Sequence, residues 1–82
     1  MGTQLSIENF EEIYHATYHR TLRYIVCKCS NVEDANDILQ ETYVELYRIL
    51  QKRKTMVLNN YQNYIIGIAK KKMQKHYGLL YT

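Results

Sequence analysis

The stretch that decides the fold is residues 30–51, which read SNVEDANDILQETYVELYRILQ. Ser30 followed by Glu33 is the pattern of a capping box, in which each side chain bonds to the other residue's backbone amide at a helix start. Apolar residues then recur at steps of three and four, the spacing of one helix face. That face comprises Ala35, Ile38, Leu39, Thr42, Leu46, Ile49 and Leu50. The stretch therefore predicts an amphipathic helix over 31–51.

The opposite side of this helix carries a compact polar stripe, which we name the α-stripe. Its residues are Asp37, Gln40, Glu41, Val44 and Arg48. Polar residues outside a helix ordinarily only meet water, but a stripe that mixes acids with an exposed valine can also dock a basic helical partner. We therefore treat the α-stripe as a candidate protein-binding face.

Two more helices are predicted on either side. Ser6 can cap a first helix over 7–29, and either Asn59 or Asn60 can cap a third helix over 60–77. The apolar stripe of the first helix comprises Phe10, Ile13, Tyr14, Tyr18, Leu22, Ile25, Val26 and Cys29. The inward face of the third comprises Tyr61, Tyr64, Ile65, Ile68 and Ala69, and its outer face includes Gly67.

These elements predict an all-α fold, a compact bundle of three principal helices. The 82 residues have room for one small domain, which we place at 6–78, with flexible ends at 1–5 and 79–82. Residues 51–60 are expected to form a loop. Its apolar run, Met56 to Leu58, can either fold back onto the core or contact a ligand.

Charge is segregated along the chain. All eight acids lie between Glu8 and Glu45, so residues 1–51 carry a net charge of −4 and residues 52–82 one of +7, which gives the +3 of the whole chain. Cations interleaved with tyrosines suit nucleic acid, since cations meet phosphates and rings stack on exposed bases. The alternative is a basic face that only meets water. The candidate nucleic-acid residues are Lys52, Arg53, Lys54, Asn59, Asn60, Tyr61, Tyr64, Lys70, Lys71, Lys72 and Lys75.

Several function classes find no support in the sequence. Cys27 has no matched base and no Gly-rich phosphate loop is present, so we expect neither an enzyme nor a cofactor. His15 and His19 have a zinc-compatible spacing, but no acidic ligand is suitably placed, so we expect no metal. Cys27 and Cys29 would point to opposite sides of a helix, which favours free thiols in a reducing cytoplasm. The sequence contains no run of eighteen apolar residues, so we predict no membrane span.

Three segments together resemble region 2 of bacterial sigma-70-type factors, and most closely the extracytoplasmic-function group. They are FEEIY at 10–14, NVEDANDILQETY at 31–43 and YQNYIIGIAK at 61–70. The group typically opens with FEELY and continues with a xPEDAEDLVQETF-like run, a loop and a WLYxIARN-like helix. The resemblance covers about residues 8–77. Tyr64 stands in place of the usual Trp, Gly67 in place of a larger residue, and Lys71 where Asn is frequent.

The resemblance implies a bacterial cytoplasmic domain that docks on the clamp helices of the polymerase beta-prime subunit. The α-stripe would face these helices. The loop from Lys52 to Asn60 would hold a flipped base of the non-template strand of the promoter −10 element, with Tyr61, Tyr64 and the Lys70–Lys75 cluster beside the melting DNA. An anti-sigma factor is a further partner of such domains. The second domain of these factors, region 4, does not fit within 82 residues, so we expect an excised domain or a stand-alone remnant.

Two alternatives stay open at this stage. One is a homeodomain-like module with its third helix in the major groove of duplex DNA, for which Asn63 and Gln74 would have to read bases. The other is a protein-interaction module whose basic tail meets an acidic partner or a membrane surface.

Overall fold

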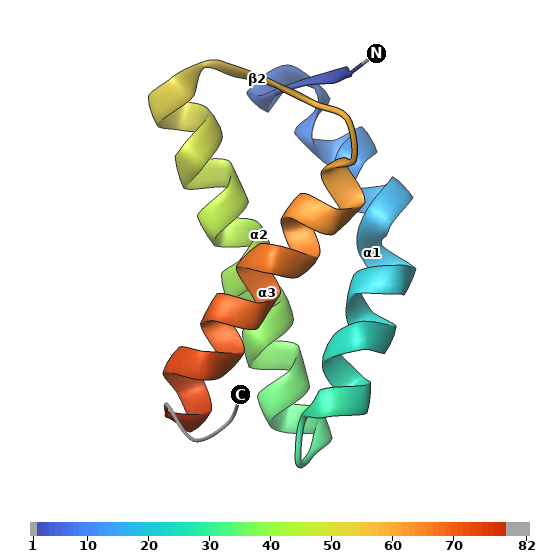
Figure 1. Cartoon of the computed structure of the whole chain (residues 1–82), viewed down its shortest axis with the longest axis vertical. Helices are drawn as coiled ribbons and strands as arrows, with labels where there is room; N and C mark the ends of the chain where they lie inside the picture. Colours follow the sequence, from blue (N-terminus) through green and yellow to red (C-terminus); the bar gives the residue numbers. More distant parts are fainter. Residues whose placement is uncertain (1, 79–82) are drawn as a thin grey trace.

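The computed structural model describes residues 2–78 and contains three helices that pack on one another (Figure 1). Helix α1 spans Phe10–Lys28, α2 spans Val32–Arg53 and α3 spans Tyr61–Tyr77. Helices α1 and α2 lie side by side and are joined by a short turn, and α3 packs across both (Figure 1). The predicted three-helix arrangement is therefore confirmed. Within the described residues, no helix combines the length and apolar character needed to cross a membrane.

The expectation of an all-α fold is wrong in one respect, because two short strands pair at one end of the molecule. Strand β1 (Thr3–Ser6) runs antiparallel to β2 (Thr55–Leu58), with Leu5 opposite Met56. Both of these side chains are buried in the core. Two isolated strands are only marginally stable in water. Burial of Leu5 and Met56 against the helices supplies the stabilisation that the pairing alone lacks.

This sheet corrects two predictions about local order. Of the predicted flexible ends, residues 3–5 are part of β1, while residues 1 and 79–82 lie outside the described part. Residues 51–60 are not a single loop: α2 continues to Arg53, the chain reverses at Lys54 with a φ of 69°, and β2 follows. Within the apolar run, Met56 folds onto the core and Val57 stays 68% exposed.

Helix α2 supplies more of the core than any other element, through its predicted face and one unpredicted addition. Six of the seven predicted residues are buried, Ile49 is half-buried, and Tyr43 joins them. On α1 the buried residues step by four, from Ile13 through Thr17 and Thr21 to Ile25. Val26 of the predicted stripe is 47% exposed, because this four-residue step turns it away from the core.

The buried threonines form a polar junction that joins the three helices. Thr17 Oγ1 donates to the Ile13 carbonyl at 2.8 Å and lies 2.6 Å from the Tyr43 hydroxyl. The single proton of the Tyr43 hydroxyl is shared between Thr17 Oγ1 and Thr21 Oγ1, the latter 3.1 Å away. Thr21 Oγ1 also accepts from Gln62 Nε2 at 3.0 Å. Burial raises the pKa of Tyr43 above the usual value of a phenol. Hydrogen bonding in this way removes most of the cost of burying hydroxyls.

Two of the three predicted helix starts change in detail. Asn31, not Ser30, caps α2, and its Oδ1 accepts from the Asp34 amide at 2.8 Å. A 3-10 turn at Ile7–Asn9 separates Ser6 from α1, and the Ser6 amide donates to Asn9 Oδ1. The third start is confirmed, since Asn60 Oδ1 accepts from the Asn63 amide at 3.0 Å.

Candidate protein and nucleic-acid interfaces

The α-stripe lies on the solvent-facing side of α2, and all five of its side chains are exposed. Together they line a shallow depression whose α3 side is formed by Lys72 and Lys75. Val44 is 50% exposed in its midst. The predicted residues are therefore brought together, with two cations at their edge that the sequence assigned to the nucleic-acid set.

One of these cations is already engaged with α2. Lys72 Nζ donates to Glu45 Oε1 at 3.2 Å, and Arg48 NH1 lies 3.6 Å from the same oxygen. The hydrogen bond from Lys72 is the main reason why the pKa of Glu45 is lowered from its usual value. The Lys72 side chain is only 18% exposed, so it fastens α3 to α2 more than it reaches outward.

An aromatic groove of about 650 Å³ borders the α-stripe, between α1 and α2. Tyr47 is 38% exposed on its surface, and its ring meets Phe10 edge-on with centroids 5.2 Å apart. Gln40, Val44 and Arg48 line both this groove and the depression of the α-stripe. Acids, a half-exposed valine and aromatic rings thus form one continuous surface along α2.

The candidate nucleic-acid residues fall into two groups. The first lies at the end of the molecule that carries the sheet, where Lys52, Arg53 and Lys54 end α2 and Asn59 to Tyr61 lead into α3. All of these are exposed except Tyr61, which is half-buried. The second group lies farther along α3. The rise along the α3 axis between Tyr61 and Lys75 is about 20 Å, at about 1.5 Å per residue. The two groups therefore do not form one compact patch.

The second group surrounds a cleft of about 480 Å³ between α2 and α3. Half-buried Tyr64, exposed Lys71 and exposed Lys75 line it beside Gly67. Apart from the adjacent residues and the nearby backbone of α3 itself, no atom of the described residues lies within 4 Å of the position that a Cβ on Gly67 would take, so the α3 backbone is approachable there. Lys70 is exposed but does not line this cleft.

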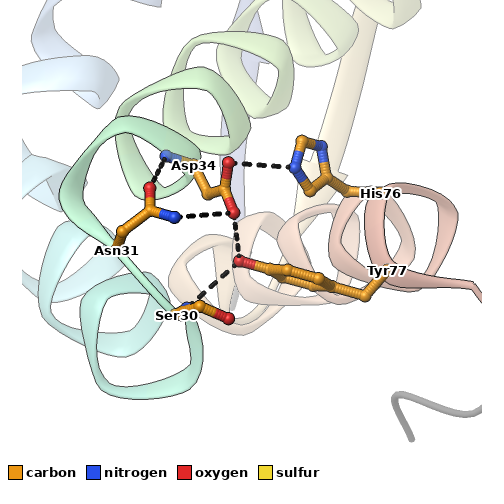
Figure 2. Close-up of polar contacts among 5 residues, drawn as sticks. All are labelled: Ser30, Asn31, Asp34, His76 and Tyr77. Atoms are coloured by element: carbon orange, nitrogen blue, oxygen red, sulfur yellow. Dashed lines mark hydrogen bonds and ion pairs between the residues drawn. The ribbon is translucent and has the colours of Figure 1, made fainter.

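Polar contacts join the last turn of α3 to Ser30, in the turn between α1 and α2, and to Asp34, in the first turn of α2 (Figure 2). The Tyr77 hydroxyl donates to Asp34 Oδ2 at 2.9 Å and accepts from the Ser30 amide at 3.2 Å. His76 Nε2 lies 3.2 Å from the other carboxylate oxygen of Asp34. The partners lie more than forty positions apart, and no sequence spacing pointed to them. These contacts hold the end of α3 that carries Lys72 and Lys75.

Sequence reasoning also missed a polar pocket of about 510 Å³ between α1 and the start of α3. From α1 it is lined by His19, Arg20 and Arg23, and from the other side by residues 59–62. No Asp or Glu lines it. The sequence did contain an indication of this pocket, because no acid lies between residues 13 and 32. The net charge of residues 1–51 is negative, so a charge count over that whole segment did not reveal the basic stretch within it.

The described residues contain no group of three or more His, Cys, Asp and Glu side chains arranged to hold a metal ion. Cys27 is exposed, Cys29 is half-buried, and both are free thiols. No protein-family model, curated protein or solved structure matches the chain.

Proposed function

We propose that this chain is a promoter-recognition domain of the sigma region 2 type. It binds core RNA polymerase through the α-stripe of α2 and binds the non-template strand of the −10 element through the β2–α3 segment and α3. It carries out no chemistry itself, because RNA synthesis belongs to the polymerase. The assignment combines the motif resemblance with the surfaces described above.

The observation that carries the proposal is the continuous surface along α2. Asp37 and Glu41 supply negative charge on the α2 side, and two of the three cations in the same depression, Arg48 and Lys72, are paired with Glu45. Exposed Val44 and the neighbouring aromatic groove supply apolar area. A face that only met water would not need the apolar part, whereas docked helices bury apolar side chains and use charges at the rim for orientation. A basic helical partner, such as the polymerase clamp helices, fits this combination.

The second support is the supply of cations and rings where a strand would pass. Lys71 and Lys75 stand beside Tyr64 in the cleft, and Lys52 to Lys54 lie at the end of α2, separated from the start of α3 by strand β2. Extruding a base from a duplex costs a few kcal/mol, which stacking and phosphate contacts must offset. Base stacking on an aromatic side chain is worth about 1–3 kcal/mol, so one or two tyrosines are sufficient in magnitude.

Charge reversal on the α-stripe tests the polymerase contact. Glu41→Lys and Asp37→Lys should each abolish co-purification with core polymerase, because a basic partner would be repelled. Both side chains are exposed, so thermal unfolding followed by circular dichroism should barely change. Glu8→Lys, which reverses an exposed acid outside the α-stripe, serves as the matched control. Folded Glu41→Lys that still binds polymerase would remove the α-stripe from the interface.

Strand choice tests the DNA contact. The chain should bind a single-stranded −10-like oligonucleotide more tightly than the matching duplex in fluorescence anisotropy. Rings and lysines suit an opened strand, whereas a homeodomain-like module needs paired bases. A clear preference for duplex would favour that alternative, with Asn63 and Gln74 as the residues to test next.

A further inference from the structure

We propose that the pocket between α1 and the start of α3 binds backbone phosphate of single-stranded DNA, with Arg20 and Arg23 as the phosphate ligands. The inference deepens the proposed function, because it takes DNA as the ligand and extends the DNA-binding surface onto α1. Neither arginine belonged to the nucleic-acid set derived from the sequence.

The position of the two arginines is the first argument. They lie on the flank of α1 that faces α3, and with His19 they form one wall of the pocket. The opposite wall is made by Asn59, Asn60, Tyr61 and Gln62. Three of these four residues are already candidates for DNA contact, so the pocket continues a surface proposed on independent grounds.

The charge of the pocket is the second argument. Both arginines are exposed, and within residues 2–78 neither forms an ion pair. No acid lines the pocket, and α1 carries none beyond Glu12. An arginine without a carboxylate partner presents its full fork of donors, and that fork matches the oxygens of a phosphate.

The rigidity and size of the pocket are the third argument. The hydrogen bond from Gln62 to Thr21 ties its two walls together, and the Asn60 cap fixes the start of α3. Because both walls are built on helices, the arginines are held at a set distance from residues 59–62. A volume of about 510 Å³ falls within the range of small-ligand pockets, about 300–1,000 Å³. The half-buried ring of Tyr61 gives one nucleotide a surface for stacking.

Salt dependence of binding tests direct phosphate contact. Each phosphate contact to a single strand contributes about 0.7 to the slope of log affinity against log salt. The double variant Arg20→Gln/Arg23→Gln should therefore lower that slope by about 1.4 for an oligothymidylate, with a more than roughly tenfold loss of affinity at low salt. Lys28→Gln removes a charge from the same helix outside the pocket and is the matched control. Equal slopes for the double variant and the control would overturn the proposal.

Thymidine 5′-monophosphate provides a test that needs neither promoter nor polymerase. In NMR titration of the intact chain, the backbone amides of Arg20, Arg23, Asn60 and Gln62 should shift with the nucleotide and should not shift in the double variant. Shifts confined to Lys70–Lys75, or no shift at all, would overturn the pocket assignment. Co-purification of wild-type chain with polymerase decides the proposed function separately, so the two can fail independently.

Discussion

The hydroxyl of Tyr43 on α2 lies 2.6 Å from Oγ1 of Thr17 on α1, and both residues are buried. The same hydroxyl donates to Thr21, which accepts from Gln62 at the start of α3. The phenol therefore links α2 to α1, and the bond from Gln62 to Thr21 adds α3 to the same junction. It also supports the wall of the pocket assigned to phosphate, since Gln62 belongs to that wall.

Removal of this hydroxyl tests the junction. Tyr43→Phe should lower the free energy of unfolding by about 1–2 kcal/mol in urea denaturation, because a buried hydrogen bond is lost and the threonines lose a partner. Tyr24→Phe is the control, since the Tyr24 hydroxyl makes no hydrogen bond within the described residues. Equal stability of the two variants would show that the junction contributes only packing.

Acid pH should weaken the contact between Glu45 and Lys72. The pKa of Glu45 is lowered in the folded state, chiefly by the hydrogen bond from Lys72, so its stabilisation is present above the unfolded-state value of 4.5. It is lost as the pH falls from there through the lower folded-state value. Wild type should exceed Glu45→Gln in stability at pH 7, and the difference should disappear in acid.

Urea denaturation at a series of pH values from 7 to 3 measures this difference. Glu8→Gln controls for the loss of one exposed charge, since Glu8 forms no ion pair within the described residues. A difference between wild type and Glu45→Gln that stays constant across the series would contradict a role for the ion pair.

The N-terminal strand should be essential for stability. Leu5 is fully buried opposite Met56, so Leu5→Ala should cost about 2–5 kcal/mol through lost burial and the cavity left behind. Gln4→Ala changes an exposed side chain of the same strand and should alter stability by less than about 0.5 kcal/mol. Thermal and urea unfolding measure both. A small effect of Leu5→Ala would return residues 3–5 to the flexible end expected from the sequence.

Gly67 allows stability and binding to be separated. Gly67→Ala should raise the free energy of unfolding by about 0.8–1 kcal/mol, because alanine is the better helix former and its Cβ meets no atom. If DNA runs along the cleft between α2 and α3, the added methyl group should lower affinity for a single strand.

Gly78→Ala is the contrasting variant, since its φ of 88° makes any Cβ unfavourable and stability should fall. Anisotropy and urea denaturation on both variants give the two readouts. A stabilised Gly67→Ala with unchanged affinity would exclude the α3 backbone from the path of the strand.

Local features of the chain were predictable because they depend on neighbours within about one helical turn. The apolar spacing of residues 35–50 identified the buried face of α2, and its complement identified the α-stripe as exposed. Asn59 and Asn60 were both recognisable as candidate caps for the same reason, and the structure uses Asn60, whose partner Asn63 is three residues away.

The predicted apolar face of α1 was partly wrong, because it was chosen by side-chain type, whereas burial also depends on partners from other helices. Thr17 and Thr21 are polar by composition, yet Tyr43 and Gln62 satisfy their hydroxyls and allow them into the core. Val26 is apolar, yet it faces solvent. The residue type indicates only the free-energy cost of burying a polar group without a hydrogen-bond partner. The tertiary structure decides whether such a partner is present and removes that cost.

The sequence by itself determined three helices, the outward face of α2 and the accumulation of cations in residues 52–75, because each follows from spacing or composition along the chain. Only the tertiary structure decided that Leu5 pairs with Met56 and that the Tyr77 hydroxyl donates a hydrogen bond to Asp34. It also decided that Arg20 and Arg23 face the start of α3. These contacts join residues that are about 35 to 50 positions apart. Their formation depends on how the helices cross and pack, and no local spacing encodes that geometry.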